Sequence, residues 1–394
     1  MPFSDISIII NNSKCICSDL QHADYSPAYA WFNYFLIIIL LPSISVFGVL
    51  ANILNIYVYS RKRMQTSANN YLLFLACSDF LVILTGLFIF WLDSARSYIP
   101  SLAHVPYMTV YALPFGYMAQ TCSIYFTVAA AIDCYVQVSW EEIRDNYCTV
   151  KKAMEINICI TLCSIIYNSL RFPQFNLRKC FHDATQELII EICPTALFFA
   201  INTIYNVYMY MILMTLLPFL CLSILNAMIV VRKSVKPTDL EQNVENDDDT
   251  LTMIMVVVIF LCCNTLALIV NLIETFFNPD ALLLNFLTDG SNFLVIFNSS
   301  VNCLIYLIFN KIYRQIFLYA FFFKNFLIKL DIFFLYQSIR HFLIKLDLLN
   351  CSDHQLWLGN HLKYDRNIDE WLTSSSGFFI FERQKNPSIS ALKL

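Results

Sequence analysis

Seven long apolar segments constrain the fold of this chain more than any other feature of its sequence. They cover residues 33–60, 69–92, 107–138, 153–172, 208–232, 250–276 and 286–309. A helix of about 20 apolar residues crosses the hydrocarbon core of a bilayer, and each segment reaches that length. Strands of a membrane barrel are roughly half as long. The sequence therefore predicts an all-α membrane protein, a bundle of seven transmembrane helices.

The composition agrees with a bilayer location and argues against several function classes. Of the 394 residues, 58% are apolar, whereas a soluble domain has about 45–50%. The net charge is -4, and no basic patch of the size that nucleic acid requires is present, so we expect no nucleic-acid partner. The sequence has no HExxH motif and no glycine-rich phosphate loop. We therefore expect no enzyme activity.

Lys and Arg concentrate in the connections on one side of the predicted bundle. That side holds Arg61, Lys62, Arg63, Arg144, Lys151, Lys152, Arg232, Lys233, Lys236, Lys311 and Arg314, and the other holds Lys14, Arg96, Arg171, Arg178 and Lys179. Because basic loops stay in the cytoplasm, we expect an extracellular N-terminus and a cytoplasmic C-terminus in the plasma membrane. The sequon at Asn11 is then a predicted glycosylation site in the outer tail.

The predicted organisation has four parts. An extracellular tail covers 1–32, the seven-helix domain 33–309, a short amphipathic helix at the membrane interface 310–324, and a cytoplasmic tail 325–394. The acidic connection 233–249 is predicted to be a solvated loop. The phrase FLIKLD occurs at 326–331 and again at 342–347. This repeat is either a second membrane-surface helix or a duplication or fault in the coding sequence.

Asp79 is an acid in the middle of the second apolar segment, without a Lys or Arg in the same segment. Since a charge in a bilayer costs roughly 2.5–3.5 kcal/mol, it requires partners. Ser123, Asn298, Ser299 and Asn302 lie at middle or inner depth in two other segments. Together these five residues could hold a hard cation through oxygen ligands or hydrogen-bond a protonated carboxyl, and the alternative is polar contact between helices.

Most of the fifteen cysteines fall in or at the ends of apolar segments, where they act as small core residues. Four lie in polar connections and are candidates for disulfides: Cys15, Cys17, Cys180 and Cys193. The sequence leaves all three pairings of these four open.

Several short motifs together resemble the rhodopsin-like G-protein-coupled receptors over residues 40–317. GVLANILNIYVYSRKRM resembles the end of the family's first helix and the first inner loop, and NNYLLFLACSDFLV resembles its second helix, with Asn52 and Asp79 at the matching positions. The matching positions in later segments are Pro218, Phe260, Cys263, Asn302 and Tyr306. Within the family, YMAQTCSIYFTVAAAIDCY and NFLVIFNSSVNCLIY are most similar to invertebrate FMRFamide-type neuropeptide receptors. The resemblance implies an extracellular peptide ligand and a heterotrimeric G protein as partners.

The resemblance also assigns roles to residues. Asp79 and its four candidate partners match the family's allosteric sodium site, which favours Na⁺ over plain contact between helices. Asp133, Cys134 and Tyr135 stand where the family has its Asp-Arg-Tyr motif, whose arginine pairs with the acid at rest and reaches the G protein on activation. A thiol carries no fixed cation and can do neither. We expect Asp133 to remain solvated at the interface.

Other positions also depart from the family pattern. Leu266 and Cys303 replace the prolines of the sixth and seventh helices, and Asn264 stands where many relatives have tryptophan. The disulfide cysteine expected near Thr109 is absent. Cys180 and Cys193 are left to pair with each other or with the N-terminal cysteines.

Two ligand classes are disfavoured by single positions. An opsin requires a lysine where this chain has Ile296, and an amine receptor requires an acid at Gly116. A peptide is then the expected ligand. For the guanidinium of an Arg-Phe-amide peptide, the candidate carboxylates at the outer mouth are Glu274 first, then Asp289 and Asp93; Tyr117, Gln120 and Asn292 are candidates for the pocket floor. The alternative for each acid is a solvated carboxylate without a ligand. The alternative for Tyr117 and Gln120 is packing within the bundle.

Three functions remain open. The first is a neuropeptide receptor that couples to a G protein despite Cys134. The second is an atypical receptor that binds a ligand or partners but couples weakly or not at all. A transporter or channel is disfavoured because the sequence has no internal repeat and no pair of broken segments.

Overall fold

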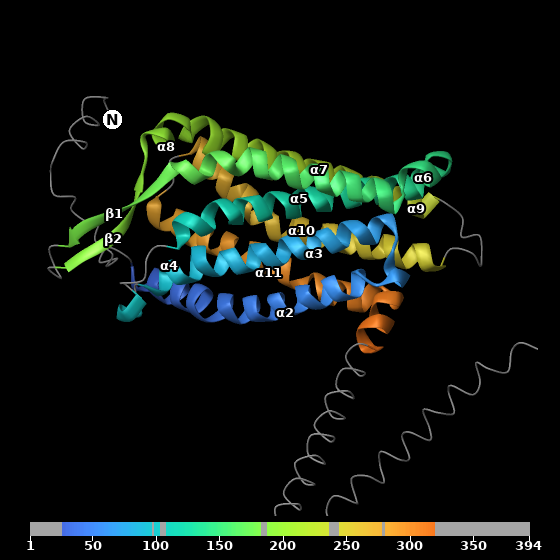
Figure 1. The fold of residues 1–394 in the computed structure, drawn as a ribbon, viewed down its shortest axis with the longest axis horizontal. Coiled ribbons are helices and arrows are strands. Elements are labelled where there is room, and N and C mark those ends of the chain that lie inside the picture. Colours follow the sequence, from blue (N-terminus) through green and yellow to red (C-terminus); the bar gives the residue numbers. More distant parts are fainter. Residues whose placement is uncertain are drawn as a thin grey trace, which may run out of the picture. The chain divides into compact units, whose positions relative to one another are not determined.

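The computed structural model describes residues 26–96, 98–102, 108–182, 187–235, 244–277 and 280–319, within a single compact unit that ends at Tyr319. Seven helical spans are long and apolar enough to cross a membrane (Figure 1). They are Pro27–Tyr59, Ser67–Ala95, Val110–Ser139, Val150–Gln174, Ala196–Ser234, Asp249–Phe276 and Leu282–Phe309. All seven predicted segments are confirmed as helical spans.

The first three spans are built from α-helices with short irregular turns. The first contains α1 (Pro27–Asn33), the π-type turn η1 (Tyr34–Leu40) and α2 (Leu41–Tyr59). The second contains α3 (Ser67–Gly86), η3 (Leu87–Trp91) and α4 (Leu92–Ala95), and the third is α5 (Thr109–Ser139). Two 3₁₀ turns, η2 (Lys62–Met64) and η4 (Pro100–Leu102), lie in the connections.

The remaining elements complete the bundle. The fourth span is α7 (Val150–Asn168) with η5 (Ser169–Gln174), after the loop helix α6 (Glu141–Tyr147). A hairpin of β1 (Phe175–His182) and β2 (Glu187–Pro194) follows. The fifth span contains α8 (Ala196–Ile201), the π-type η6 (Asn202–Leu216) and α9 (Leu217–Val235); α10 (Val244–Phe276) and α11 (Ala281–Phe309) contain the last two.

Two spans begin earlier than the hydropathy of the sequence indicates, because a capping hydroxyl sets their start. Ser26 Oγ accepts a hydrogen bond from the Tyr29 backbone N–H at 3.3 Å, and Pro27 follows in the first helical position. Thr195 Oγ1 caps α8 in the same way, through the Phe198 N–H at 3.5 Å. The predicted starts at 33 and 208 therefore lie inside helices.

The acidic connection was predicted to be a loop up to residue 249, and this prediction is wrong at its end. Helix α10 already begins at Val244 and includes the acidic run of residues 247–249. Carboxylates near a helix N-terminus interact favourably with its unpaired N–H groups, so an acidic run is compatible with the first turns of a helix.

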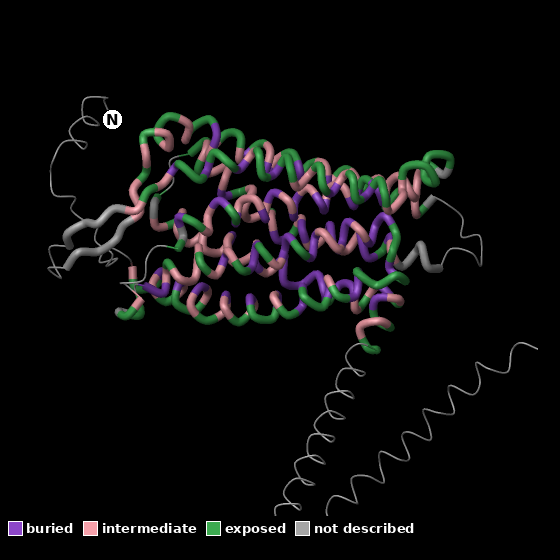
Figure 2. Tube along the Cα trace, in the orientation of Figure 1, coloured by how far each residue is buried: buried purple, intermediate pink, exposed green. Residues whose placement is uncertain are grey.

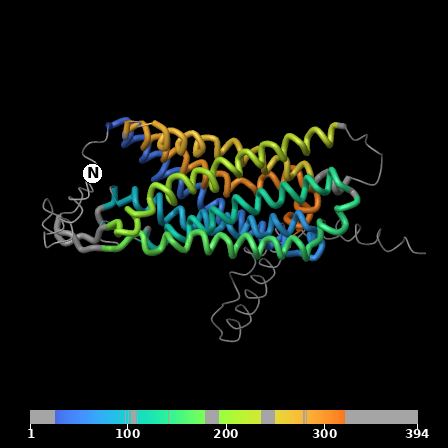
Figure 3. The backbone as a smooth tube through the Cα atoms, turned by 90° about the horizontal axis from the view of Figure 1, so that it is seen from above, coloured from blue at the N-terminus to red at the C-terminus, as the bar shows by residue number. Residues whose placement is uncertain are grey.

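The first and last spans lie side by side and close the bundle, with α2 packed against both α3 and α11 (Figure 3). Buried positions gather along α3 and α5 (Figure 2). The outward faces carry large exposed apolar side chains such as Ile166 and Ile204. An apolar outer surface around a polar-containing core suits a lipid surrounding.

The two ends of the bundle differ in structure. The hairpin lies at one end and α6 at the other (Figure 1). Following the orientation predicted from the basic residues, we call these the outer end and the inner end.

At the inner end, a short helix over 311–319 follows α11. Tyr313 is fully buried whereas Lys311 and Arg314 are exposed, as expected for an amphipathic interfacial helix. The rest of the predicted 310–324 helix and both FLIKLD repeats lie outside the described residues.

The hairpin was not predicted. Its strand register decides whether Cys180 and Cys193 can form a disulfide with each other. Cys180 pairs with Ile189 and Cys193 pairs with Asn176, so the two cysteines are four pairs apart. That offset corresponds to about 14 Å along a strand, beyond the reach of a disulfide. A bond between Cys180 and Cys193 does not fit this register, and Cys15 and Cys17 lie outside the described residues.

Candidate functional site

Asp79 is the centre of a polar cluster inside the bundle. Its side chain, on α3, is fully buried. Its Oδ1 accepts hydrogen bonds from Ser123 Oγ on α5 at 2.7 Å and from Ser299 Oγ on α11 at 3.0 Å. Its Oδ2 accepts one from Asn302 Nδ2 at 2.8 Å. Three of the four predicted partners, from two other helices, thus meet at one carboxylate.

The cluster has the chemistry of a site for a hard cation. Two hydroxyl oxygens each lie within hydrogen-bond distance of the same carboxylate oxygen, and such oxygens are the ligands that hard cations such as Na⁺ and Ca²⁺ prefer. Asn298 is buried nearby on α11 but makes no hydrogen bond to Asp79 among the described contacts. The residues present fit a sodium ion, and their three donors also satisfy the carboxylate without one.

A chain of hydrogen bonds leads from this cluster to the inner end through α2. The Ser299 carbonyl accepts from Asn52 Nδ2 at 2.9 Å, and Asn52 Oδ1 accepts from Asn55 Nδ2 at 3.2 Å. Gly48 permits this close approach of α2 and α11, because a Cβ there would collide with the Ser300 side chain. Asn55 Oδ1 in turn accepts from the Tyr313 hydroxyl at 2.6 Å.

The short helix after α11 connects this series of hydrogen bonds to α10. Asn310 Oδ1 caps that helix by accepting from the Tyr313 N–H at 2.8 Å. The same amide donates through Nδ2 to Asp249 Oδ1 at 2.8 Å. Sequence reasoning missed this contact because Asp249 was placed in a solvated loop. The amide thus links the inner end of α10 to the turn after α11.

The Tyr313 hydroxyl also lies 3.4 Å from the sulfur of Cys303, the residue in the place of the helix-seven proline. Burial and the nearby Cys303 raise the pKa of Tyr313 above its usual value. The phenol therefore stays protonated and available as a donor. Tyr306 packs edge-on against Tyr59 with ring centroids 5.2 Å apart, and both rings contact Tyr313.

Asp133 was expected to be solvated, and that expectation is wrong. Only 1% of its surface is exposed. Its Oδ2 accepts hydrogen bonds from Ser67 Oγ at 2.8 Å and from Gln137 Nε2 at 2.7 Å. A hydroxyl at the start of α3 and an amide one helical turn away thus satisfy the acid that lacks an arginine. Gln137 at the i+4 position was the signal available in the sequence.

Cys134 is 3% exposed and packs in an apolar cluster with Ile229 and Met253. The thiol lies beside Thr250 of α10. Tyr135 is half-buried next to it. The thiol itself carries no cation, and Lys233 of α9 lies close enough to Cys134 to interact with it electrostatically.

Cys148, in the connection after α6, was not singled out in the sequence. Its sulfur lies 3.7 Å from the Asp133 backbone oxygen. Burial, with the Asp133 charge nearby, raises the pKa of Cys148 to about 12. Because the thiolate is the reactive form, this cysteine is a poor nucleophile at neutral pH.

The two missing prolines leave unbroken helices. Leu266 lies within α10 and Cys303 within α11, and both helices continue over their full length. Phe260 and Cys263 are buried on α10, in the positions of the family motif. Asn264 Nδ2 bonds to the Phe260 carbonyl at 2.9 Å, so its side chain turns back on its own helix.

The predicted ligand carboxylates have different surroundings at the outer end. Asp289 Oδ2 accepts from the Tyr29 hydroxyl and from Asn33 Nδ2, both at 2.8 Å, so α1 holds it against α11. Glu274 is exposed on the last turn of α10, and Asp93 lies in the short helix α4. The three acids thus belong to three different spans.

Arg171 is a buried cation that sequence reasoning had counted only as a loop residue. It is 5% exposed, and its guanidinium lies 3.6 Å from the centre of the Tyr117 ring. Its Nε donates to Asn168 at 3.2 Å and its Nη1 to Asn206 at 3.1 Å. In the described part of the chain it forms no salt bridge.

This arginine joins three spans close to the predicted pocket floor. Tyr117 belongs to α5, Arg171 to η5 and Asn206 to η6. Of the other predicted floor residues, Gln120 lies beside Tyr210 and Asn292 is half-buried on α11.

The chain is similar to known receptors along most of its length. The family model for 7 transmembrane receptors (rhodopsin family) matches residues 51–306. The probable G-protein coupled receptor frpr-1 of Caenorhabditis elegans is 34% identical over 308 residues, which cover 73% of this chain and 79% of that protein.

Two further relatives extend this similarity. The FMRFamide receptor of Drosophila melanogaster is 30% identical over 72% of this chain and 53% of its own length. The FMRFamide peptide receptor frpr-18 of Caenorhabditis elegans is 26% identical over 68% of this chain and 65% of its own length. With seven helical spans, the family match and relatives of this identity, the chain belongs to the rhodopsin family of seven-transmembrane G-protein-coupled receptors.

Proposed function

We propose that this receptor transmits the binding of an extracellular FMRFamide-like neuropeptide across the plasma membrane to a heterotrimeric G protein, and that it is not an enzyme. The observation that carries the proposal is the 30% identity to the FMRFamide receptor of Drosophila melanogaster over 72% of the chain. The basic residues at the inner end support a multi-pass orientation with the N-terminus outside.

Glu274 is the proposed partner of the guanidinium of an Arg-Phe-amide peptide. It is exposed at the outer end of α10, whereas Asp289 already accepts two hydrogen bonds from α1. An arginine and a carboxylate can form paired, charge-assisted hydrogen bonds. Asp93 is the second candidate, and Tyr117, Gln120 and Asn292 are proposed to line the floor.

Peptide binding tests this assignment. We expect Phe-Met-Arg-Phe-amide or a related peptide to bind membranes that contain the native chain. Glu274→Gln should weaken that binding by about tenfold to a hundredfold, the equivalent of one charge-assisted hydrogen bond. Asp280→Asn, at an exposed acid close by, is the matched control. Equal affinities in all three proteins would remove Glu274 from the site, and failure of the whole peptide panel would count against the ligand class.

Na⁺ is proposed as an allosteric ion at Asp79. The hydroxyl oxygens of Ser123 and Ser299 lie beside the carboxylate, and in this proposal the side-chain oxygens of Asn302 and Asn298 would turn towards the ion. An ion bound there would neutralise a buried charge and hold α3, α5 and α11 together, so its role in this receptor would be to favour one arrangement of the helices.

In this proposal, the inner end of α10 is held at rest by the bond between Asp249 and Asn310 rather than by an arginine. The bond joins α10 to the turn after α11, and Asn55 and Tyr313 continue it into the core. A G protein that inserts between these elements would have to break a bond of about 1 kcal/mol or somewhat more. That is a small barrier to coupling.

A second candidate function is favoured by Cys134. This residue is 3% exposed and carries no cation, so the family's direct contact between arginine and G protein is impossible here. A receptor that binds peptide without promoting nucleotide exchange would have the same structure. Measurement of peptide-stimulated nucleotide exchange on the G protein distinguishes the two functions, because only the coupling receptor promotes it.

A further inference from the structure

One lysine at the inner end has different surroundings from the other basic residues there. Of the basic residues that the structure describes at this end, Lys233 alone is half-buried, and the others, including its neighbour Arg232, are exposed. A half-buried lysine packs its apolar stem against the protein and directs its ammonium group to the nearest polar surface. The side chain of Lys233 therefore belongs partly to the packed interior of the bundle.

The position of Lys233 places it beside Cys134. It lies in the last turn of α9, which ends at the same end of the bundle as α6 (Figure 1). Ile229, one turn earlier on the same face of α9, is 1% exposed and packs in the cluster that contains Cys134 and Met253. Helix α9 packs against both α5 and α10. Lys233 is thus at the junction of three helices.

Two opposite charges lie close to the Cys134 thiol at this junction. The Lys233 ammonium on α9 and the Asp249 carboxylate on α10 both interact with it electrostatically. Asp249 also accepts the bond from Asn310 that holds the inner end of α10. Because the thiol of Cys134 has no fixed charge, the positive charge at this junction comes from α9 and not from α5.

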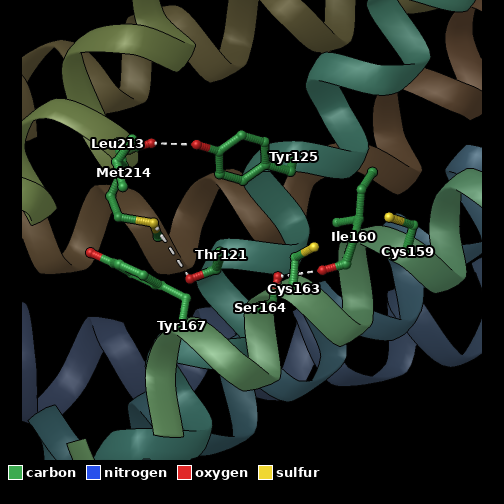
Figure 4. Close-up of a pocket in the computed structure, with 9 residues that line it drawn as sticks. All are labelled: Thr121, Tyr125, Cys159, Ile160, Cys163, Ser164, Tyr167, Leu213 and Met214. Atoms are coloured by element: carbon green, nitrogen blue, oxygen red, sulfur yellow. Dashed lines mark hydrogen bonds between the residues drawn. The ribbon is translucent and has the colours of Figure 1, made fainter. Parts of the chain in front are cut away.

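The cavity between α5, α7 and η6 has the opposite character. Its volume is ≈ 340 Å³, and none of the residues that line it is an acid or a base (Figure 4). A charged group of a partner would lose its hydration there without gaining an opposite charge. Of these two places, only the junction at Lys233 can pair with a charged group of a partner.

Movement of α10 would change the surroundings of Lys233. In the proposed function, a G protein that inserts at the inner end breaks the bond between Asp249 and Asn310. Asp249 moves with α10, whereas Lys233 belongs to α9. The attraction between the two charges decreases with their separation, so the ammonium gains by pairing with another acceptor. Carboxylates and the carbonyl end of a helix are acceptors of this kind.

We propose that Lys233 is the cation through which the inner end binds an anionic group of the G protein, in the role of the arginine that is absent at Cys134. The inference rests on the proposed function, because it assigns a residue to the same coupling step. The group on the G protein is an oxygen acceptor with negative charge, either a carboxylate or the carbonyl end of a helix.

Peptide-stimulated nucleotide exchange tests this role. It is measured with the full chain in membranes, a heterotrimeric G protein and an Arg-Phe-amide peptide whose binding to each protein has been verified. Lys233→Gln should lower the exchange rate about tenfold, the equivalent of one charge-assisted hydrogen bond. Lys233→Arg keeps the charge and should stay within about twofold of the native chain. Arg232→Gln, at the exposed neighbouring position, is the matched control and should also stay within about twofold.

An arginine at position 134 makes the test specific. When Cys134→Arg supplies a cation at the junction, adding Lys233→Gln to the same chain should lower exchange by less than about twofold. Two residues with the same role are not additive, and a double-mutant cycle measures this departure from additivity. A general loss of positive surface would instead lower exchange by the same factor with and without Cys134→Arg.

Three outcomes would overturn the proposal. Equal exchange by Lys233→Gln and Arg232→Gln would show that Lys233 has no role of its own. An equal loss with and without Cys134→Arg would show that Lys233 does not act in the role of the arginine. In both cases the native chain still couples, so the proposed function stands. No exchange by the native chain with peptide bound would overturn the proposed function together with this inference.

Discussion

The middle of the bundle and its inner end each contain a buried aspartate on a core helix, but they satisfy it differently. Asp79 draws donors from two other helices, so its hydrogen bonds hold the bundle together. Asp133 draws donors from Ser67 and from Gln137 on its own helix. The comparison shows that an acid can lose its expected cation and still be buried, provided that neutral donors lie within one turn or in a helix alongside.

The largest loss of folding stability should come from the loss of Asp79, in the middle of the bundle. Asp79→Ala leaves two hydroxyls and an amide without their acceptor in the core, and should destabilise the receptor by about 3 kcal/mol or more. Asp133→Ala leaves two donors near the inner surface and should cost about 2 kcal/mol or less. Thermal unfolding of the purified variants checks the order, and a lower midpoint for Asp133→Ala would contradict the comparison.

Asn310→Ala should have the next largest effect, and its main effect should be on signalling. It removes the bond to Asp249 and should raise basal nucleotide exchange about fivefold, the equivalent of one hydrogen bond. It also removes the cap on the Tyr313 N–H, so a loss of stability of about 1 kcal/mol should accompany the rise in exchange. Gln315→Ala, an exposed position on the same short helix, is the control. Unchanged basal exchange in Asn310→Ala, with coupling intact in the native chain, would show that this bond does not restrain α10.

Sodium should distinguish the two aspartates. A ligand that binds only the folded state raises the unfolding midpoint as its concentration increases. We expect NaCl to raise the midpoint of the native chain above that in choline chloride, and to lose this effect in Asp79→Asn but retain it in Asp133→Asn. The same sodium response in all three proteins would place the ion elsewhere.

The smallest expected effect is on the rate of chemical modification of Cys148, which depends on the charge of the neighbouring Asp133. Because the pKa of this thiol is raised to about 12, its thiolate fraction is small at neutral pH and increases about tenfold per pH unit towards that value. Iodoacetamide should therefore modify Cys148 slowly at neutral pH and faster as pH increases. Asp133→Asn removes a nearby negative charge and should lower the pKa, so modification should be faster at a given pH. Modification is followed at Cys148 by mass spectrometry, because other cysteines such as Cys159 and Cys163 are exposed. Rapid modification of Cys148 itself at neutral pH would contradict the burial of this thiol.

The sequence predicts the spans well because a bilayer leaves few alternatives to an apolar helix of fixed length. The partners of Asp79 were predictable because the family pattern names their positions. The surroundings of Asp133 were not, since Ser67 is 66 positions away and comes within reach only when α3 and α5 pack together.

The outer end was harder to predict for the same reason. Asp289 is held by α1, which begins at Pro27 and not at 33, so the helix that occupies this carboxylate was taken for part of the tail. The buried position of Arg171 depends on Tyr117 and Asn206, which belong to two other spans. Contacts between distant segments of this kind are not encoded in any local pattern.

Nucleotide exchange by the native chain and by Cys134→Arg tests the central claim most directly. Both proteins are measured in membranes with a heterotrimeric G protein and a panel of Arg-Phe-amide peptides, after peptide binding to each has been verified. The account predicts peptide-stimulated exchange by the native chain, because the restraint on α10 is the bond between Asp249 and Asn310. Exchange by Cys134→Arg alone would contradict it and identify the native chain as a peptide-binding receptor that does not couple.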